Sequence, residues 1–189
     1  MSAALCLSGE GAPVELWLLR LAAARPRQRQ AAREWLTAEL ARRGAGARAG
    51  WTESSKGPRM ARGAPWQSSF SYCGPYILCG LSRLGVPGVD LAGGAPWSDA
   101  AEVALLYCGP EAAAGLAACP PADRPDAFAR AWSALEARLK ACRRGLEEYC
   151  AERERHLAAA RITCQVRHDG LWASAALCPD AARGGGDGS

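Results

Sequence analysis

Residues 126–149 read DAFARAWSALEARLKACRRGLEEY, and this stretch carries the strongest periodic pattern in the chain. Steps of three and four residues place side chains on one face of an α-helix. Asp126 follows Pro125, and both residue types are common at helix starts. The pattern predicts one long amphipathic helix from 126 to about 160, whose apolar face must pack against another helix in this chain or in a copy of it. The large side chains that recur at these steps are Phe128, Trp132, Leu135, Leu139, Cys142, Leu146 and Tyr149.

Apolar residues before this stretch also have helical spacing. Two stripes precede Gly44, one after Pro13 and one after Pro26, and they predict an N-terminal helical hairpin over residues 1–43. Together with the long helix, the segments before residue 126 predict a mainly α fold, a helical bundle of five or six helices. Glycine and proline at the boundaries predict three further helices, at 75–84, 98–108 and 110–119.

Composition divides the rest of the chain. Residues 44–65 are rich in glycine and proline, which predicts a flexible linker between the hairpin and a helical core domain over 66–180. Apolar and polar residues alternate over 162–166, and residues 171–177 either pair with them as a β-hairpin or form a short helix. The glycine-rich residues 181–189 are expected to form a disordered tail.

The charge and hydropathy patterns exclude several classes of partner. The net charge is only +4, and the arginines of 143–161 alternate with glutamates, so a nucleic-acid partner is not expected. No apolar run approaches the roughly 20 residues that span a bilayer, so we expect no membrane span. The first residues lack the basic and apolar regions of a signal peptide, which predicts a cytoplasmic protein.

Nine cysteines and two histidines are the candidate metal ligands. No two cysteines have the Cys-x-x-Cys spacing, and neither His156 nor His168 stands at ligand spacing from a cysteine pair. The glycine-rich motifs that bind nucleotide phosphates are absent from the sequence as well. We therefore expect no metal, no cofactor, and free thiols that act as small apolar side chains.

Cys73 is the candidate nucleophile, because it precedes Gly74 and Pro75 at a predicted helix start. This arrangement resembles papain-like cysteine peptidases, in which a helix start lowers the pKa of the thiol. The resemblance implies Gln67 as the oxyanion residue, His168 as the base, and Asp169 or Asp180 as its partner. Two observations weigh against a peptidase. Tyr-Cys-Gly-Pro recurs at 107–110, and residues 75–160 show no strand pattern of the kind that a papain-like fold needs.

The segments 76–85 and 98–108, followed by the long amphipathic helix, resemble a second family. The first reads YILCGLSRLG and precedes Val86-Pro87, and the second reads SDAAEVALLYC. This order is similar to that of small α-helical proteins of tailed phages and prophages, including tail assembly chaperones. The resemblance implies a protein that keeps a tail component such as the tape measure protein soluble during virion assembly, in the host cytoplasm.

The sequence thus leads to a functional hypothesis with two alternatives. The hypothesis is a non-enzymatic binding protein of the tail-assembly-chaperone type, whose partner is a tape measure or tail tube protein. The first alternative is the papain-like peptidase. The second is a self-associating structural protein, which would form a homo-oligomer. The apolar face of the long helix supplies the expected contact residues, namely Trp132, Cys142, Leu146 and Tyr149.

Overall fold

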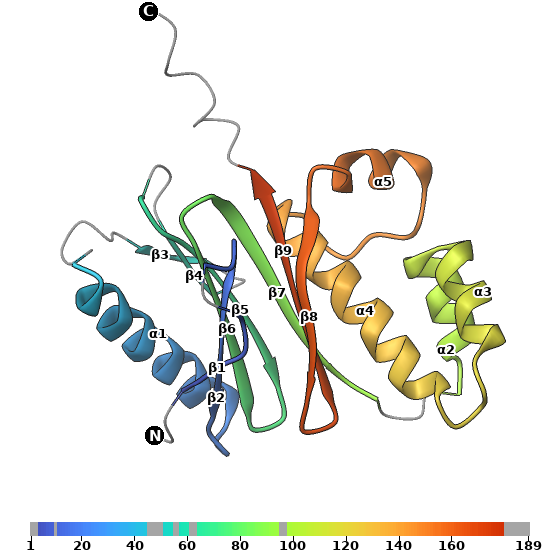
Figure 1. Cartoon of the computed structure of the whole chain (residues 1–189), viewed down its shortest axis with the longest axis horizontal. Helices are drawn as coiled ribbons and strands as arrows, with labels where there is room; N and C mark the ends of the chain where they lie inside the picture. The colour runs from blue at the N-terminus through green and yellow to red at the C-terminus, as the bar shows by residue number, and fades with distance from the viewer. Residues whose placement is uncertain are drawn as a thin grey trace, which may run out of the picture.

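The computed structural model describes residues 4–9, 11–44, 51–54, 57–60, 64–94 and 98–179. It has a mixed α/β fold with two antiparallel sheets, so the prediction of a mainly α bundle is wrong (Figure 1). The first sheet has the strand order β1-β2-β6-β5 and the second has the order β7-β9-β8, and a separate hairpin pairs β3 with β4.

The helices lie outside the two sheets, with α1 on one side and α2, α3, α4 and α5 on the other (Figure 1). The strands are β1 (Leu5–Cys6), β2 (Glu15–Arg20), β3 (Trp51–Ser54), β4 (Gly57–Met60), β5 (Gln67–Cys73), β6 (Tyr76–Ser82), β7 (Gly85–Gly93), β8 (Arg161–His168) and β9 (Leu171–Pro179). The helices are α1 (Arg25–Arg42), α2 (Ala100–Val103), the π-helical turn η2 (Ala104–Cys108), α3 (Pro110–Ala118), α4 (Arg124–Ala141) and α5 (Ala151–Leu157).

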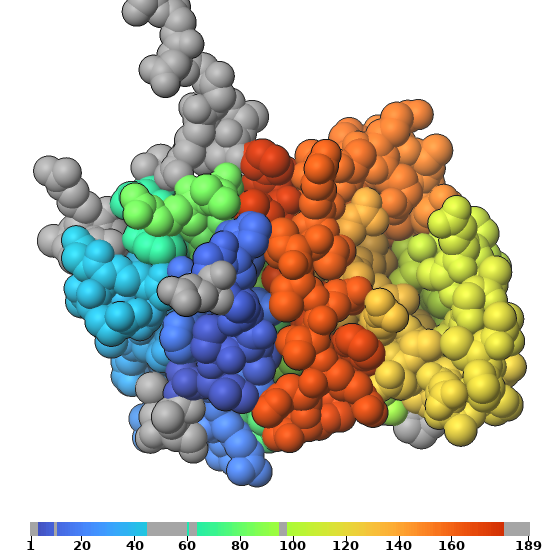
Figure 2. Space-filling model, in the orientation of Figure 1, coloured from blue at the N-terminus to red at the C-terminus, as the bar shows by residue number. Residues whose placement is uncertain are grey.

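The two sheets are the inner layers of a sandwich that α1 and α4 cover on its two outer faces. Trp35 and Leu36 of α1 pack on Ile77 of the first sheet. The opposite face of that sheet, including Leu78, packs against Val89 of the second sheet. Alanines of α4 cover the outer face of the second sheet. The space-filling view shows α1 at the left, the strands in the middle and the helices that follow β7 at the right (Figure 2).

Two of the predicted helices are strands. They were taken for helices because their residues are buried on both faces. β2 replaces the first helix of the expected N-terminal hairpin, and β6 replaces the helix expected at 75–84. Along β6, Ile77 and Cys79 face α1, whereas Leu78 faces the second sheet. A strand that is apolar on both faces has no alternation of apolar and polar residues, so periodicity cannot separate it from a buried helix.

The long helix predicted over 126–160 is two helices, because α4 ends at Ala141. Arg143 adopts a left-handed conformation with φ of 57°. Its N–H donates to the Lys140 carbonyl, and the Arg144 N–H donates to the Leu139 carbonyl. These two bonds form a Schellman motif, which ends a helix. Glycine is the usual residue at the left-handed position, so an arginine there left no signal in the sequence.

The chain between α4 and α5 is held by a buried cation. The side chain of Arg153 is 1% exposed. Its Nη1 donates to the carbonyls of Tyr107 and Glu147, at 2.6 and 2.8 Å, and its Nη2 contacts Glu154 at 2.6 Å. A buried guanidinium is tolerated when such partners surround it. Arg153 therefore ties the connecting segment and α5 to η2.

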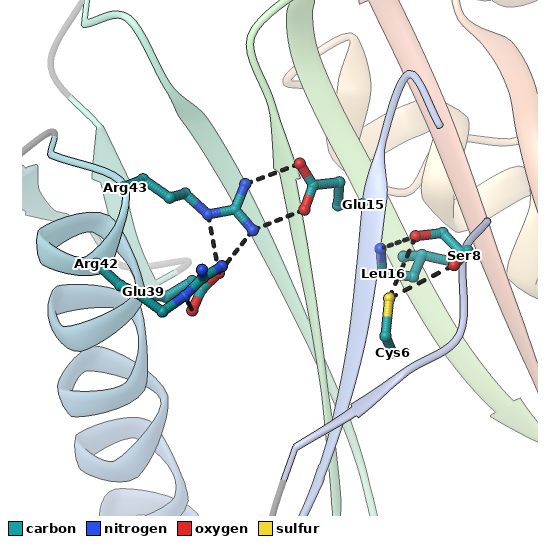
Figure 3. Close-up of polar contacts among 7 residues, drawn as sticks. All are labelled: Cys6, Ser8, Glu15, Leu16, Glu39, Arg42 and Arg43. Carbon is teal, nitrogen blue, oxygen red and sulfur yellow. Dashed lines mark hydrogen bonds and ion pairs between the residues drawn. The ribbon is translucent and has the colours of Figure 1, made fainter. Parts of the chain in front are cut away.

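Ion pairs hold the C-terminal end of α1 on the first sheet (Figure 3). Both terminal nitrogens of Arg43 donate to the Glu15 carboxylate of β2, at 2.7 and 2.6 Å, and Nη2 also contacts Glu39. Such two-point contacts fix the orientation of a guanidinium as well as its distance. Nearby, the Ser8 hydroxyl accepts from the Leu16 N–H at 3.0 Å, which fastens the chain after β1 to β2.

α4 lies very close to the second sheet because small residues meet at their contact. The cluster between them consists of Ala137, Ala141, Ala160 and Ala176. A Cβ atom added at Gly88 of β7 would overlap the Ala137 carbonyl oxygen and the Ala141 nitrogen. The polar contacts across this interface include a 2.7 Å hydrogen bond between the buried hydroxyls of Ser133 and Ser174. The absence of a side chain at Gly88 therefore sets the position of α4.

The predictions for 98–108, 110–119 and the C-terminal segments are confirmed, whereas the flexible linker and the disordered tail stay predictions. Residues 98–108 and 110–119 contain α2 with η2, and α3, and the C-terminal segments form the β8–β9 hairpin. The expected linker over 44–65 contains the β3–β4 hairpin, and Met60 and Ala64 belong to the α1 core. The expected tail over 181–189 lies outside the described residues. In the part of the chain that the structure describes, no helix combines the length and the apolar composition needed to cross a membrane.

Substitution of Gly88 tests the close contact of α4 with β7. We expect Gly88→Ala to lower the free energy of unfolding by about 3 kcal/mol, because the new methyl group meets backbone atoms that cannot rotate away. Gly115→Ala in α3 is the control, since no atom lies within 4 Å of its added Cβ. In a helix this change should stabilise by about 0.5–1 kcal/mol. Urea unfolding measures both variants, and equal stabilities would contradict the contact.

Candidate functional site

Side chains rather than backbone pairs join the two sheets along β5 and β7. The Ser69 hydroxyl accepts from the Val89 N–H at 3.1 Å, and the Ser71 hydroxyl accepts from the Leu91 N–H at 3.2 Å. Cys73 continues the series through a hydrogen bond with the Gly93 backbone. These three residues alternate along β5, so their side chains lie on one face of the strand. We call this series the β5–β7 junction.

A charged cluster extends the junction to α4. The Ser71 hydroxyl donates to the Asp90 carboxylate at 2.7 Å. From α4, Lys140 Nζ donates to the same carboxylate oxygen at 2.6 Å and to the Val89 carbonyl at 3.1 Å. Glu136 lies 3.9 Å from Lys140. Asp90 is therefore paired although it is buried, and the cluster fixes α4 beside β5.

A groove runs along α4 above this cluster, and we call it the α4 groove. It consists of two adjoining cavities of about 620 and 300 Å³, which share Phe70, Glu136 and Lys140 in their walls. The larger cavity lies between α1, β5, β7 and α4, and its lining on α4 extends from Phe128 to Lys140. The smaller cavity continues past the end of α4 to Leu146. At 1.5 Å per residue, the helix from Phe128 to its end gives the groove a length of about 20 Å.

Aromatic side chains line the larger cavity. Phe70 and Tyr72 come from β5 and are half-buried, whereas Phe128 and Trp132 come from α4. The rings of Phe128 and Trp132 stack with centroids 5.7 Å apart, and Tyr107 meets Trp132 edge-on at 5.9 Å. These contacts hold Trp132 in place, so the cavity presents a fixed aromatic surface to an apolar ligand group.

The other wall of the larger cavity is cationic. Arg25 and Arg29 come from the first turns of α1, and the Arg25 guanidinium lies 4.9 Å from the centroid of the Tyr72 ring. The Tyr72 hydroxyl is buried and has no hydrogen-bond partner among the described residues. Burial raises the pKa of this phenol, so the hydroxyl keeps its proton. It is therefore a hydrogen-bond donor without an acceptor in the described part of the chain.

The four contact residues expected from the sequence separate into two groups. Trp132 and Leu146 line the two cavities of the α4 groove, and Leu146 is 48% exposed. Cys142 instead packs on the alanine cluster under α4, and its thiol donates to the His156 carbonyl. Tyr149 is exposed beyond the groove, and its N–H donates to the Leu106 carbonyl.

Three of the four residues of the peptidase alternative are described, and no contact joins these three into one site. Cys73 and Gln67 stand at opposite ends of β5, about 20 Å apart in an extended strand. His168 ends β8, and no hydrogen bond joins it to Cys73 among the described residues; its Nε2 lies 3.6 Å from Asp169. Asp180 lies outside the described residues. Cys73 also ends a strand instead of starting a helix, so the geometry gives a peptidase no support.

The α1 and β5 sides of the groove were not predicted from the sequence. Arg25, Arg29, Phe70 and Tyr72 meet α4 only through the tertiary fold, so no local spacing connects them. One signal was present in the sequence: residues 68–73 read SSFSYC, in which Ser69 and Ser71 alternate with two aromatic residues. That alternation is typical of a strand with one polar and one apolar face.

No protein-family model and no curated protein sequence matches this chain. Within the described ranges, no group of three or more histidine, cysteine, aspartate or glutamate side chains could hold a metal ion.

The β5–β7 junction predicts different effects for two neighbouring serines. We expect Ser71→Ala to destabilise the protein by about 1–2 kcal/mol, because it removes a buried hydroxyl that bonds both Leu91 and Asp90. The hydroxyl of Ser68 is buried without a partner in the described part of the chain, so Ser68→Ala should cost nothing or stabilise. Thermal unfolding compares the two variants. A larger loss for Ser68→Ala would contradict the junction.

Cys73 should be a slow nucleophile. Burial, and to a lesser extent the Asp90 carboxylate, raises the pKa of its thiol, so little thiolate is present near neutral pH. We expect iodoacetamide to alkylate Cys73 more slowly than the exposed Cys6 at pH 8, at a rate that still rises where ordinary thiols level off. Mass spectrometry of digests measures both. Fast, selective labelling of Cys73 that His168→Ala abolishes would instead favour the peptidase.

Proposed function

We propose that this protein is a non-enzymatic binding protein that holds a segment of a partner protein in the α4 groove. The observation that carries the proposal is the continuity of two cavities along α4, with Trp132 in one and the exposed Leu146 in the other. A compact small molecule would occupy one cavity, whereas a chain segment uses the whole length. At 3.3 Å per residue, about 20 Å holds roughly six extended residues.

The composition of the walls supports a peptide occupant. Four aromatic side chains line the larger cavity, and aromatic residues are enriched among those that contribute most to protein–protein binding. Charged groups of both signs also line the two cavities, and such groups orient a ligand more than they strengthen its binding. The β5–β7 junction and the Phe128–Trp132 stack hold the walls in place before binding, which lowers the entropic cost of association.

The assignment to tail assembly chaperones stays a narrower proposal. Two segments that carried the resemblance are strands or an extended connection in the structure, namely 76–85 and 142–150. The proposal therefore keeps the part of the hypothesis that the α4 groove supports, which is binding of a protein segment without catalysis. A tape measure or tail tube protein would be one such partner.

A peptide selection with two leucine variants tests the proposed function. Linear 12-residue peptides are selected from a random library on the immobilised protein, and their affinities are measured by fluorescence anisotropy. We expect Leu146→Asp to weaken the binding of the selected peptides at least tenfold, because it places a charge in the apolar end of the groove.

Leu84→Asp is the matched control for this test. Leu84 is 62% exposed in the β6–β7 turn and does not line the groove, so affinity should stay within about twofold. Circular dichroism melting confirms that both variants fold. Equal binding by the wild type and Leu146→Asp, or a selection that yields no saturable peptide, would contradict the proposal.

A further inference from the structure

We infer that the α1 end of the α4 groove is a carboxylate subsite, so that the partner segment carries an aspartate or glutamate next to an apolar anchor. This inference rests on the proposed function and specifies the chemistry of the partner. Its elements are Arg25 and Arg29 of α1, the hydroxyl of Tyr72, and the aromatic rings of Phe128 and Trp132 that continue the same cavity.

The position of the arginines is the first argument. The first turn of α1 contains no acidic residue, and Arg25, Arg27 and Arg29 all stand near its N-terminus. The N-terminal end of a helix carries a partial positive charge, so cations there destabilise the helix slightly. Among the described residues, Arg29 makes no hydrogen bond or ion pair. An anion bound beside Arg25 and Arg29 would offset both the helix dipole and the side-chain charges.

The Tyr72 hydroxyl is the second, independent argument. A buried hydroxyl without a partner costs free energy that a bound acceptor would recover. Arg25, Arg29 and Arg33 are the cations that act on this phenol. A carboxylate oxygen is the acceptor that suits a neutral tyrosine hydroxyl and an arginine at the same time.

The charge of the cavity favours a carboxylate over a phosphate. Three cationic side chains line it, Arg25, Arg29 and Lys140, together with two carboxylates, Asp90 and Glu136. Lys140 is already engaged by Asp90, and the five charged side chains together leave one net positive charge over the whole cavity. A singly charged carboxylate neutralises this excess, whereas a doubly charged phosphate would also be repelled by Asp90 and Glu136.

Two isosteric peptides and one inorganic anion test the subsite. The probes are acetyl-Asp-Phe-amide, acetyl-Asn-Phe-amide and inorganic phosphate, titrated into the full chain at low salt. Binding is followed by NMR through the side-chain Nε–Hε signals of the arginines. We expect the Asp peptide to bind at least fivefold more tightly than the Asn peptide, with a preference that shrinks as salt screens the charges.

Two arginine variants complete the experiment. Arg29→Gln should remove the preference for Asp, while Arg27→Gln, on the same helix but outside the larger cavity, should keep it. Equal affinities of the Asp and Asn peptides would overturn the carboxylate subsite while leaving groove binding intact. Phosphate binding tighter than that of the Asp peptide would make this a phosphate site instead. Failure of the proposed function is separate, because it appears as equal binding of the selected peptides to Leu146→Asp.

Discussion

The close contact between α4 and β7 is the constraint on which the rest of this structure depends. Gly88 leaves room for the backbone of α4, and four alanines fill the contact with methyl groups only. Because the helix lies so near the sheet, Lys140 can reach Asp90 and the Val89 carbonyl. Lys140 in turn forms part of the wall where the two cavities meet. The α4 groove is thus a consequence of small residues, although large aromatic side chains line it.

How well the sequence predicted the fold depended on how many faces of each element are buried. The β8–β9 hairpin showed alternation in β8, and α3 began at a proline after a glycine, so both were found. β2 and β6 are apolar on both faces and were taken for helices. The end of α4 was not predicted, because the residue in the left-handed conformation is Arg143 and not glycine. Two hydrogen bonds offset the backbone strain of this conformation. Local sequence patterns do not contain these tertiary contributions.

The candidate site was found in part, for a related reason. Trp132 and Leu146 were predicted as contact residues from the apolar stripe of 128–149, and both line the groove. Cys142 and Tyr149 belong to the same stripe in the sequence, but α4 ends before both residues. Neither of them therefore lies in the groove. The basic wall from α1 is more than 90 residues from α4 in sequence. Only the packing of α1 against the first sheet brings these arginines near Trp132.

The β5–β7 junction has a consequence for how this protein avoids sticking to itself. The outward N–H groups of a strand at the edge of a sheet can pair with any other strand, because backbone hydrogen bonds do not depend on the identity of the side chains. Along β7 these groups are already occupied by Ser69, Ser71 and Cys73. Three short side chains therefore protect this edge. Changes at these positions would expose a template for aggregation, even where the fold itself survives.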